Sequence, residues 1–504
     1  MMKKSLLKTL DPFKWLVFFV SITSIFLISC QVEPKLRNVK STEQVLSDYI
    51  KSNPEYSEFE KLVELTSLEA VLGIRGPYTI LLPNNDAMFA YYTEKGVNSL
   101  EDFDHKFLVD LIYNHLITNE IATSDFGMGA IRDTNALGDY LVTEFDGSDI
   151  IINKYSKIIK RDVRLVNGFA HVIDRVIDPI VKDIYTVVSE NPSFKIFAEG
   201  LKITGIKDTL QQISFHYGKR MARNRFTVFA VSDSTFLRYG IHDVGELIKW
   251  TGANADSVAF LNNPFYRFIE YHCLNGTYYL SDFKTQMYSI LSSDNHISMT
   301  IDTDYKINYN STTKKYTGFI IPVSNTPSKN GALHVINDLL PVIDPEPTSF
   351  IFETTDFFDL KQQDCFGKYY QKYSDGENTF AKIKWEGNYL QYYYKPTQPE
   401  NMHYDALQMF GYWRISVTFP KVMKGKYAVS VFQPIWGDAI APCKVYLDGV
   451  RTPYDYETTA TGGVGGLQVI AEVDFKTTVE HTITLENYLW GGCWWDYARF
   501  DPIK

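Results

Sequence analysis

The sequence lacks the local motifs that announce many enzymes and metal sites. Its 504 residues contain no G-x-S-x-G nucleophile elbow, no phosphate-binding P-loop and no H-E-x-x-H zinc motif. The five cysteines never occur in C-x-x-C spacing, and no D-x-D-x-D-G calcium loop is present. Sixty acidic residues leave a carboxylate pair for glycoside hydrolysis open, but no segment favours one. We therefore expect no catalytic residues, no metal ligands and no cofactor.

Positive charge is also in short supply. Fifty Lys and Arg against 60 Asp and Glu give a formal net charge of −10, which argues against a nucleic-acid partner. The apolar fraction of 45% and the charged fraction of 22% are ordinary for globular proteins. A chain of this length is expected to form about three domains. The aromatic fraction of 15% suits strand-rich domains.

The N-terminus has the pattern of a secretory signal. Basic residues through Lys14 precede an apolar run that ends at Cys30 and is short for a bilayer span. Residues 27–30, Leu-Ile-Ser-Cys, resemble the bacterial lipobox, which implies a signal peptide over 1–29, a lipidated Cys30 and a tether over 30–42. An uncleaved transmembrane anchor is the alternative. Glu33, and no Asp at position 31, fit an outer-membrane lipoprotein of a Gram-negative envelope, with periplasmic or exterior orientation left open.

Four cysteines follow Cys30 in a compartment where disulfides persist. They are Cys273, Cys365, Cys443 and Cys493. Two interpretations stay open: one bridge within the last domain among the final three, or buried free thiols.

An internal repeat decides the architecture of the middle of the chain. Residues 78–89 and 226–236 each form an apolar strand, a polar helix cap and a helix start. Residues 107–116 and 265–274 are helical patterns that end in His-Leu or His-Cys-Leu. Each copy then closes with a similar strand, N-G-F-A-H-V-I-D in the first and N-G-A-L-H-V-I-N in the second.

Both copies resemble fasciclin-like domains, and the resemblance covers residues 43–344. It implies α+β domains over 43–181 and 182–344, with a role in adhesion and recognition, and histidines that are structural. The residues that carry the motif are Thr79, Pro83, His115, Asn167, Gly168 and His171 in the first copy, and Thr227, His272, Asn330, Gly331 and His334 in the second.

After a Pro-rich break at 344–347 the pattern changes to short alternating strands. Residues 426–432, 443–449 and 481–486 are three of them, and together they predict an antiparallel β-sandwich over 345–504. The region resembles the jelly-roll sandwiches of galactose-binding-like and carbohydrate-binding modules.

The sandwich contains the densest aromatic cluster of the sequence. Flat rings with polar neighbours suit a sugar-binding surface, although sandwich cores also bury Trp and Tyr. The candidate ligand-binding residues are Trp436, Trp490, Trp494, Trp495 and Tyr497, with Trp490 the best candidate for exposure because two glycines follow it.

Two functions follow from these patterns. The first is a non-catalytic envelope lipoprotein, anchored through Cys30, that binds extracellular proteins or glycans through its fasciclin-like domains. The second is a glycan-binding accessory of an outer-membrane polysaccharide-uptake system, in which the sandwich captures the sugar.

Overall fold

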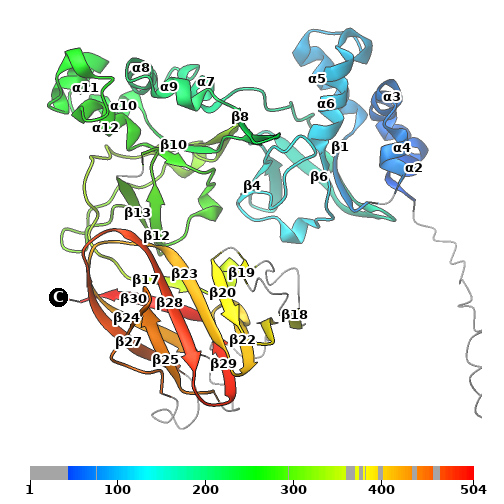
Figure 1. The fold of residues 1–504 in the computed structure, drawn as a ribbon. Coiled ribbons are helices and arrows are strands. Elements are labelled where there is room, and N and C mark those ends of the chain that lie inside the picture. Colours follow the sequence, from blue (N-terminus) through cyan, green and yellow to red (C-terminus); the bar gives the residue numbers. More distant parts are fainter. Residues whose placement is uncertain are drawn as a thin grey trace, which may run out of the picture.

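The computed structural model describes most of the chain downstream of the predicted tether. The described residues are 44–74, 76–292, 295–358, 369–373, 379–380, 382–394, 401–433, 440–457 and 466–503. Cys30, Cys365 and Trp436 lie outside them, as do the predicted signal peptide and the whole of the predicted tether. Two units of mixed helix and strand precede an all-β unit (Figure 1). The predicted fold class is therefore confirmed.

The first repeat is a seven-stranded sheet with helices packed on it. Its centre is the parallel pair β1 (Tyr78–Pro83) and β7 (Gly168–Ile173), in the order β2-β1-β7-β6-β5-β4-β3. Pro83, which has no N–H, ends β1 opposite Ile173. The other elements are α2 (Leu46–Ser52), α3 (Ser57–Thr66), α4 (Glu69–Gly73), α5 (Asn85–Lys95), α6 (His105–His115), β2 (Leu116–Ile117), β3 (Gly129–Ala130), β4 (Val142–Asp146), β5 (Asp149–Ile152) and β6 (Ser156–Leu165).

The second repeat keeps the central parallel pair but divides its strands among smaller sheets. β10 (Phe226–Val231) lies parallel to β16 (Gly331–Ile336) in the order β11-β10-β16-β15. Gly331 faces Phe226, and a Cβ there would lie 2.3 Å from the Phe226 carbonyl oxygen. The other elements are α7 (Ile184–Ser189), α8 (Lys195–Ile203), α9 (Ile206–Leu210), β8 (Ser214–Tyr217), β9 (Arg220–Arg223), α10 (Asp233–Leu237), α11 (Val244–Trp250), α12 (Pro264–Glu270), β11 (Cys273–Asn275), β12 (Gln286–Ser289), β13 (His296–Ile301), β14 (Tyr305–Ile307) and β15 (Thr326–Ser328).

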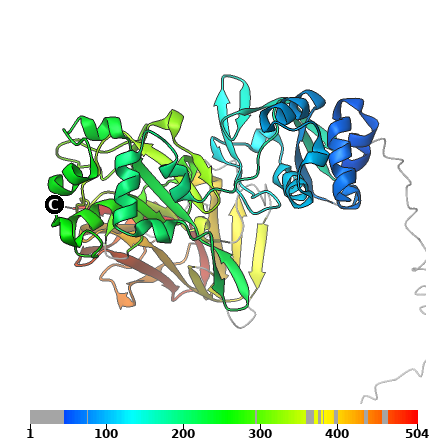
Figure 2. The ribbon, with the colours of Figure 1, turned by 90° about the horizontal axis from the view of Figure 1, so that it is seen from above.

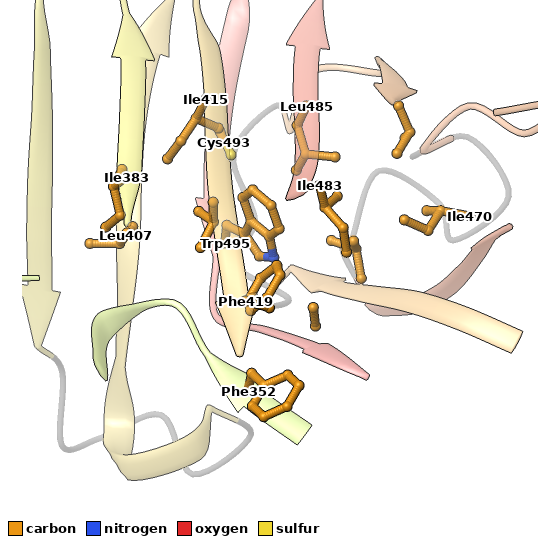
Figure 3. Packing of buried hydrophobic residues seen from close by; sticks show 14 of the residues in the cluster. Phe352, Ile383, Leu407, Ile415, Phe419, Ile470, Ile483, Leu485, Cys493 and Trp495 are labelled. Atoms are coloured by element: carbon orange, nitrogen blue, oxygen red, sulfur yellow. The ribbon is translucent and has the colours of Figure 1, made fainter. Parts of the chain in front are cut away.

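The sandwich has three antiparallel sheets, in the orders β17-β30-β24-β27, β18-β21-β22-β29 and β19-β20-β23-β28-β25-β26. Apolar side chains from all three meet in one core around Trp495 and Phe419 (Figure 3). Its strands are β17 (Phe350–Glu353), β18 (Tyr369–Tyr373), β19 (Thr379–Phe380), β20 (Ile383–Glu386), β21 (Tyr389–Tyr394), β22 (Asp405–Gly411), β23 (Arg414–Val422), β24 (Gly425–Gln433), β25 (Cys443–Leu447), β26 (Val450–Arg451), β27 (Gly466–Phe475), β28 (Val479–Asn487), β29 (Gly491–Trp495) and β30 (Tyr497–Pro502).

The three units contact one another in sequence. The second repeat stacks on the sandwich, and the first repeat lies to the side (Figures 1 and 2). Between the repeats, the almost fully buried carboxylate of Asp139 accepts from Arg223 and from Lys329, both at 2.6 Å. Between the second repeat and the sandwich, Lys284 Nζ lies 2.5 Å from Asp356. The ion pairs at these two junctions tie the units together.

Candidate functional site

The sandwich has a concave site where three turns meet at one end, which we call the loop-end pocket. The turns join β20 to β21, β22 to β23 and β28 to β29. The pocket has a volume of about 300 Å³. It is lined by Glu386, Gly387, Tyr412, Trp413, Arg414, Glu486 and Asn487. Residues as far apart in the chain as Glu386 and Asn487 thus line one pocket.

Charged side chains of alternating sign cross the sheet at this pocket. Glu386, Arg414, Glu486 and Lys444 are successive cross-strand neighbours on β20, β23, β28 and β25. Arg414 Nη1 lies 3.4 Å from Glu486 Oε2, and its guanidinium lies 5.4 Å from the Tyr446 ring centroid. Opposite charges on neighbouring strands stabilise a sheet by roughly 0.2–1 kcal/mol per pair. Of the four, Glu386, Arg414 and Glu486 line the pocket, which places hydrogen-bond acceptors on either side of a donor.

The turns of the pocket are held by buried hydrogen bonds. Asn487 Nδ2 donates to the carbonyl oxygens of Gly411, at 2.7 Å, and Leu489, at 2.8 Å. Asn487 Oδ1 accepts from the Trp413 N–H at 2.8 Å, and Trp413 Nε1 donates to the Gly491 carbonyl at 3.1 Å. This network fixes the backbone on either side of residue 412. The ring of Tyr412 projects from it with 69% of its surface exposed.

The predicted aromatic residues divide between surface and core. Trp490 is 63% exposed and meets Phe410 edge-on at 5.3 Å. Trp494 is 5% exposed and packs on the same Phe410 at 5.6 Å. Tyr497 is half-buried and stacks on Phe432 at 4.8 Å between ring centroids. These contacts put Trp490 beside the loop-end pocket, whereas Trp436 lies outside the described residues.

The prediction that Trp495 contacts a ligand is wrong. Its side chain has no exposed surface and lies in the core against Phe419 (Figure 3). The strand β29 is covered on both faces, so alternation along it turns no side chain of Gly491–Trp495 to solvent. Sequence reasoning also missed Tyr412. The only signal for it was a Gly-Tyr-Trp turn between two alternating strands.

A second polar cluster lies inside the sandwich, around three buried acidic residues. Tyr392 and Thr355 donate to the two carboxylate oxygens of Asp405, at 2.9 and 2.8 Å. His403 Nδ1 lies 2.7 Å from Glu353 Oε1. The third, Asp496, accepts from the Met402 N–H at 3.0 Å through Oδ2, while its Oδ1 has no hydrogen-bond partner among the described residues.

Burial is the main influence on the protonation of this cluster. It raises the pKa of Asp405 to about 6 and that of Asp496 to about 8, and the neighbouring charge of Glu353 adds to both shifts. The hydrogen bond to Glu353 raises the pKa of His403. Among the described residues, no group of three His, Cys, Asp or Glu side chains is arranged to hold a metal ion. The cluster is a proton-binding feature of the interior and is separate from the loop-end pocket.

The repeat motif has a structural role that is the same in both copies. Asn167 Oδ1 accepts from the Leu46 N–H, and its Nδ2 donates to the Leu72 and Ile74 carbonyls, all at 2.9 Å. Asn330 makes the corresponding three bonds at 2.8–3.0 Å. Each Asn therefore ties the first helix of its repeat to the start of the closing strand.

In each repeat a threonine and a histidine form hydrogen bonds with the backbone of the loop that follows the helix ending in the motif histidine. Thr79 Oγ1 accepts from the Ile121 N–H at 2.8 Å, and His171 Nε2 lies 2.9 Å from the Ile121 carbonyl oxygen. The equivalent residue of the second repeat is Tyr278. Its N–H donates to Thr227 Oγ1 and its carbonyl oxygen lies near His334 Nε2, both at 2.8 Å. Burial lowers the pKa of His171 and that of His334, the latter to about 4. Both imidazoles are therefore neutral near pH 7.

The two histidines at the helix ends differ in one bond. His115 Nδ1 contacts the Leu111 carbonyl at 2.8 Å, and its Nε2 accepts from the Ile177 N–H at 3.0 Å. His272 Nδ1 contacts the Phe268 carbonyl at 2.7 Å, but its buried Nε2 has no partner among the described residues. Burial lowers both pKa values to about 4.

A family model described as the fasciclin domain matches residues 54–179 and 192–342, together more than half of the chain. The chain belongs to the fasciclin domain family. Protein sll1483 of Synechocystis is 31% identical over 130 residues, which are 25% of this chain and 69% of that protein. A FAS1 domain pair from the insect cell adhesion molecule Fasciclin I aligns with 58% of this chain and 95% of its own, at 16% identity and a TM-score of 0.25. A family 35 carbohydrate-binding module from Clostridium thermocellum aligns with 27% of this chain and all of its own, at 10% identity and a TM-score of 0.19.

The cysteines of the second fasciclin domain and the sandwich are thiols wherever they are described. Cys273, Cys443 and Cys493 are buried and free, and burial raises the pKa of each. A bridge between Cys443 and Cys493, one form of the predicted disulfide, is thus contradicted. No helix among the described residues has the length and apolar character needed to span a bilayer.

Proposed function

We propose that this protein is a lipid-anchored, non-catalytic component of a Gram-negative cell envelope that binds extracellular ligands through its two fasciclin domains. The observation that best supports the proposal is the Asp139 junction. There one carboxylate of the first domain forms ion pairs with Arg223 and Lys329 of the second domain. An apolar contact among Val142, Tyr279 and Ala332 adjoins it. The junction supports a fixed spacing between the domains.

Fixed spacing suits adhesion. Two modules held at one separation bind a ligand with repeated sites far more tightly than either does alone, because the second contact is intramolecular. The tether over 30–42 and acyl chains on Cys30 would hold the pair at the outer membrane, since each buried methylene contributes roughly 0.8 kcal/mol. Extracellular proteins and glycans are the ligands that this arrangement favours.

The test uses cells that display the full chain. Palmitate labelling should tag the protein and be lost in Cys30→Ala, and adhesion to immobilised matrix proteins should be lost with it. Asp139→Ala should keep the label but weaken adhesion, because the domain spacing is released. Adhesion that is indifferent to both substitutions would contradict the proposal.

A second function, glycan capture for an outer-membrane polysaccharide-uptake system, is favoured by the loop-end pocket. Tyr412 and Trp490 offer exposed rings beside clustered carboxylate, guanidinium and amide groups. Such a combination binds sugars, since flat rings cover their apolar faces and polar groups orient their hydroxyls. Retention of the detergent-purified full chain on polysaccharide columns tests this function, and passage through every column would contradict it.

A further inference from the structure

We infer that the loop-end pocket binds an uncharged aldopyranose unit of a glycan chain, stacked on Tyr412, and that it excludes uronic acids and sulfated sugars. The inference rests on the glycan-capture function and assigns both its site and its ligand class. Three features of the pocket support it: shape, an exposed ring and a lining in which carboxylates outnumber cations.

The shape is set before any ligand arrives. Asn487 holds the Gly411 and Leu489 turns together through two hydrogen bonds and fixes the Trp413 amide through a third. Gly387 closes the opposite wall at φ +136°, where a Cβ would lie 2.9 Å from Met409 Cε. A pocket of about 300 Å³ is at the small end of ligand sites and suits a single sugar ring.

The exposed ring supplies the apolar platform. Tyr412 is 69% exposed, although the turn that carries it is rigid, so stacking would bury apolar surface with little loss of conformational freedom. Trp490 lies over the same turn, since a Cβ added at Gly411 would be 3.9 Å from its Nε1. Two exposed rings on adjacent turns suit a chain of sugars better than a single sugar.

The charges decide which sugar fits. Of the cross-strand row, Glu386, Arg414 and Glu486 line the pocket, and Lys444 lies beside Glu486 outside the lining. The lining offers two carboxylate acceptors and one guanidinium donor to vicinal hydroxyl groups, and its formal charge is −1. A uronate or sulfate would meet Glu386 and Glu486, and Arg414 is already 3.4 Å from Glu486. An uncharged ring meets no such repulsion.

The test measures binding of the detergent-purified full chain to neutral glucan, galactan, mannan and xylan oligosaccharides and to oligogalacturonate. We expect at least one neutral chain to bind, with affinity that changes less than about twofold between low and high salt, since no charge pairing is involved. Tyr412→Ala should weaken it at least about tenfold. Glu386→Gln should weaken it less, and Tyr404→Ala, an exposed tyrosine at the end of β22 away from Gly411, should change nothing.

The other outcomes overturn the inference in distinguishable ways. Neutral sugar binding that survives both Tyr412→Ala and Glu386→Gln would leave glycan capture standing and move the site elsewhere. Preference for oligogalacturonate would overturn the charge argument. No binding to any sugar, by a chain whose circular dichroism shows it folded, would overturn the glycan function together with this site.

Discussion

The fasciclin domains and the sandwich bury titratable groups of opposite kind. The domains enclose four imidazoles, each bound to backbone groups, and burial lowers their pKa values. The sandwich encloses carboxyl groups, and burial raises the pKa of Asp405 and of Asp496. In both regions desolvation favours the neutral form. The same physical cause therefore makes one region sensitive to acid and the other sensitive to alkali.

The largest expected effect is this opposite pH dependence. Unfolded imidazoles bind protons below pH about 6.5, whereas buried His115, His272 and His334 resist until about 4, so the fasciclin domains lose stability as pH falls through that window. Folded Asp496 keeps its proton up to pH about 8, whereas unfolded Asp loses it near 3.8, so the sandwich loses stability as pH rises between those values.

Two probes separate the regions during urea unfolding. Every α-helix among the described residues belongs to the fasciclin domains, so circular dichroism at the helix band follows them. Apart from Trp15 near the N-terminus and Trp250, all tryptophans lie in the 345–504 region, so fluorescence follows the sandwich. Midpoints that move with pH in the same direction for both probes would refute the comparison.

The next largest effect is the loss of stability when a buried, hydrogen-bonded asparagine side chain is removed. Asn167→Ala and Asn330→Ala each remove three hydrogen bonds, and each should lower the free energy of unfolding of its domain by about 3 kcal/mol. Asn262→Ala, on an exposed residue, is the control and should cost less than about 0.5 kcal/mol. Urea midpoints by circular dichroism give the values, and a small effect at Asn167 would show that the repeat motif does not hold the fold.

Removal of a buried carboxyl group should stabilise the sandwich, whereas removal of a buried amide destabilises a fasciclin domain. Asp496→Asn keeps an acceptor for the Met402 N–H but cannot ionise, so at pH 8 it should stabilise the sandwich by about 2 kcal/mol. At pH 4 the gain should vanish, because Asp496 is then protonated in the folded state. Fluorescence-detected unfolding at the two pH values measures the difference, and an equal effect at both would place the carboxylate in a polar environment.

The smallest effect distinguishes the two fasciclin domains. His115→Leu leaves the Ile177 N–H without its acceptor and should cost about 1–2 kcal/mol. His272→Leu removes an imidazole whose Nε2 has no partner in the part of the chain that the structure describes, and it should cost less than about 1 kcal/mol. Parallel urea titrations of the two variants provide the test. The reverse order would mean that the second domain depends on its histidine for packing.

Sequence patterns predicted the elements that are set locally. The strands that contain Thr79 and Thr227 follow from apolar runs that end in helix caps, and the alternating segments of the last region became β24, β25 and β28. The loop-end pocket escaped prediction because register places Glu386 opposite Arg414, and Arg414 opposite Glu486. The prediction for Trp495 failed for a related reason. An aromatic cluster in the sequence does not indicate which of its rings a second sheet will bury.

The amide of Asn167 also has a mechanical consequence. It fastens Leu46, where the described chain enters the first domain, to the strand by which the chain leaves, and Asn330 does the same for Ile184 in the second domain. If the proposed lipid anchor holds the N-terminus, tension from a ligand bound to the second domain would load these two hydrogen bonds. Because each domain has its own such hydrogen bond, one domain could open there under load while the other stays closed.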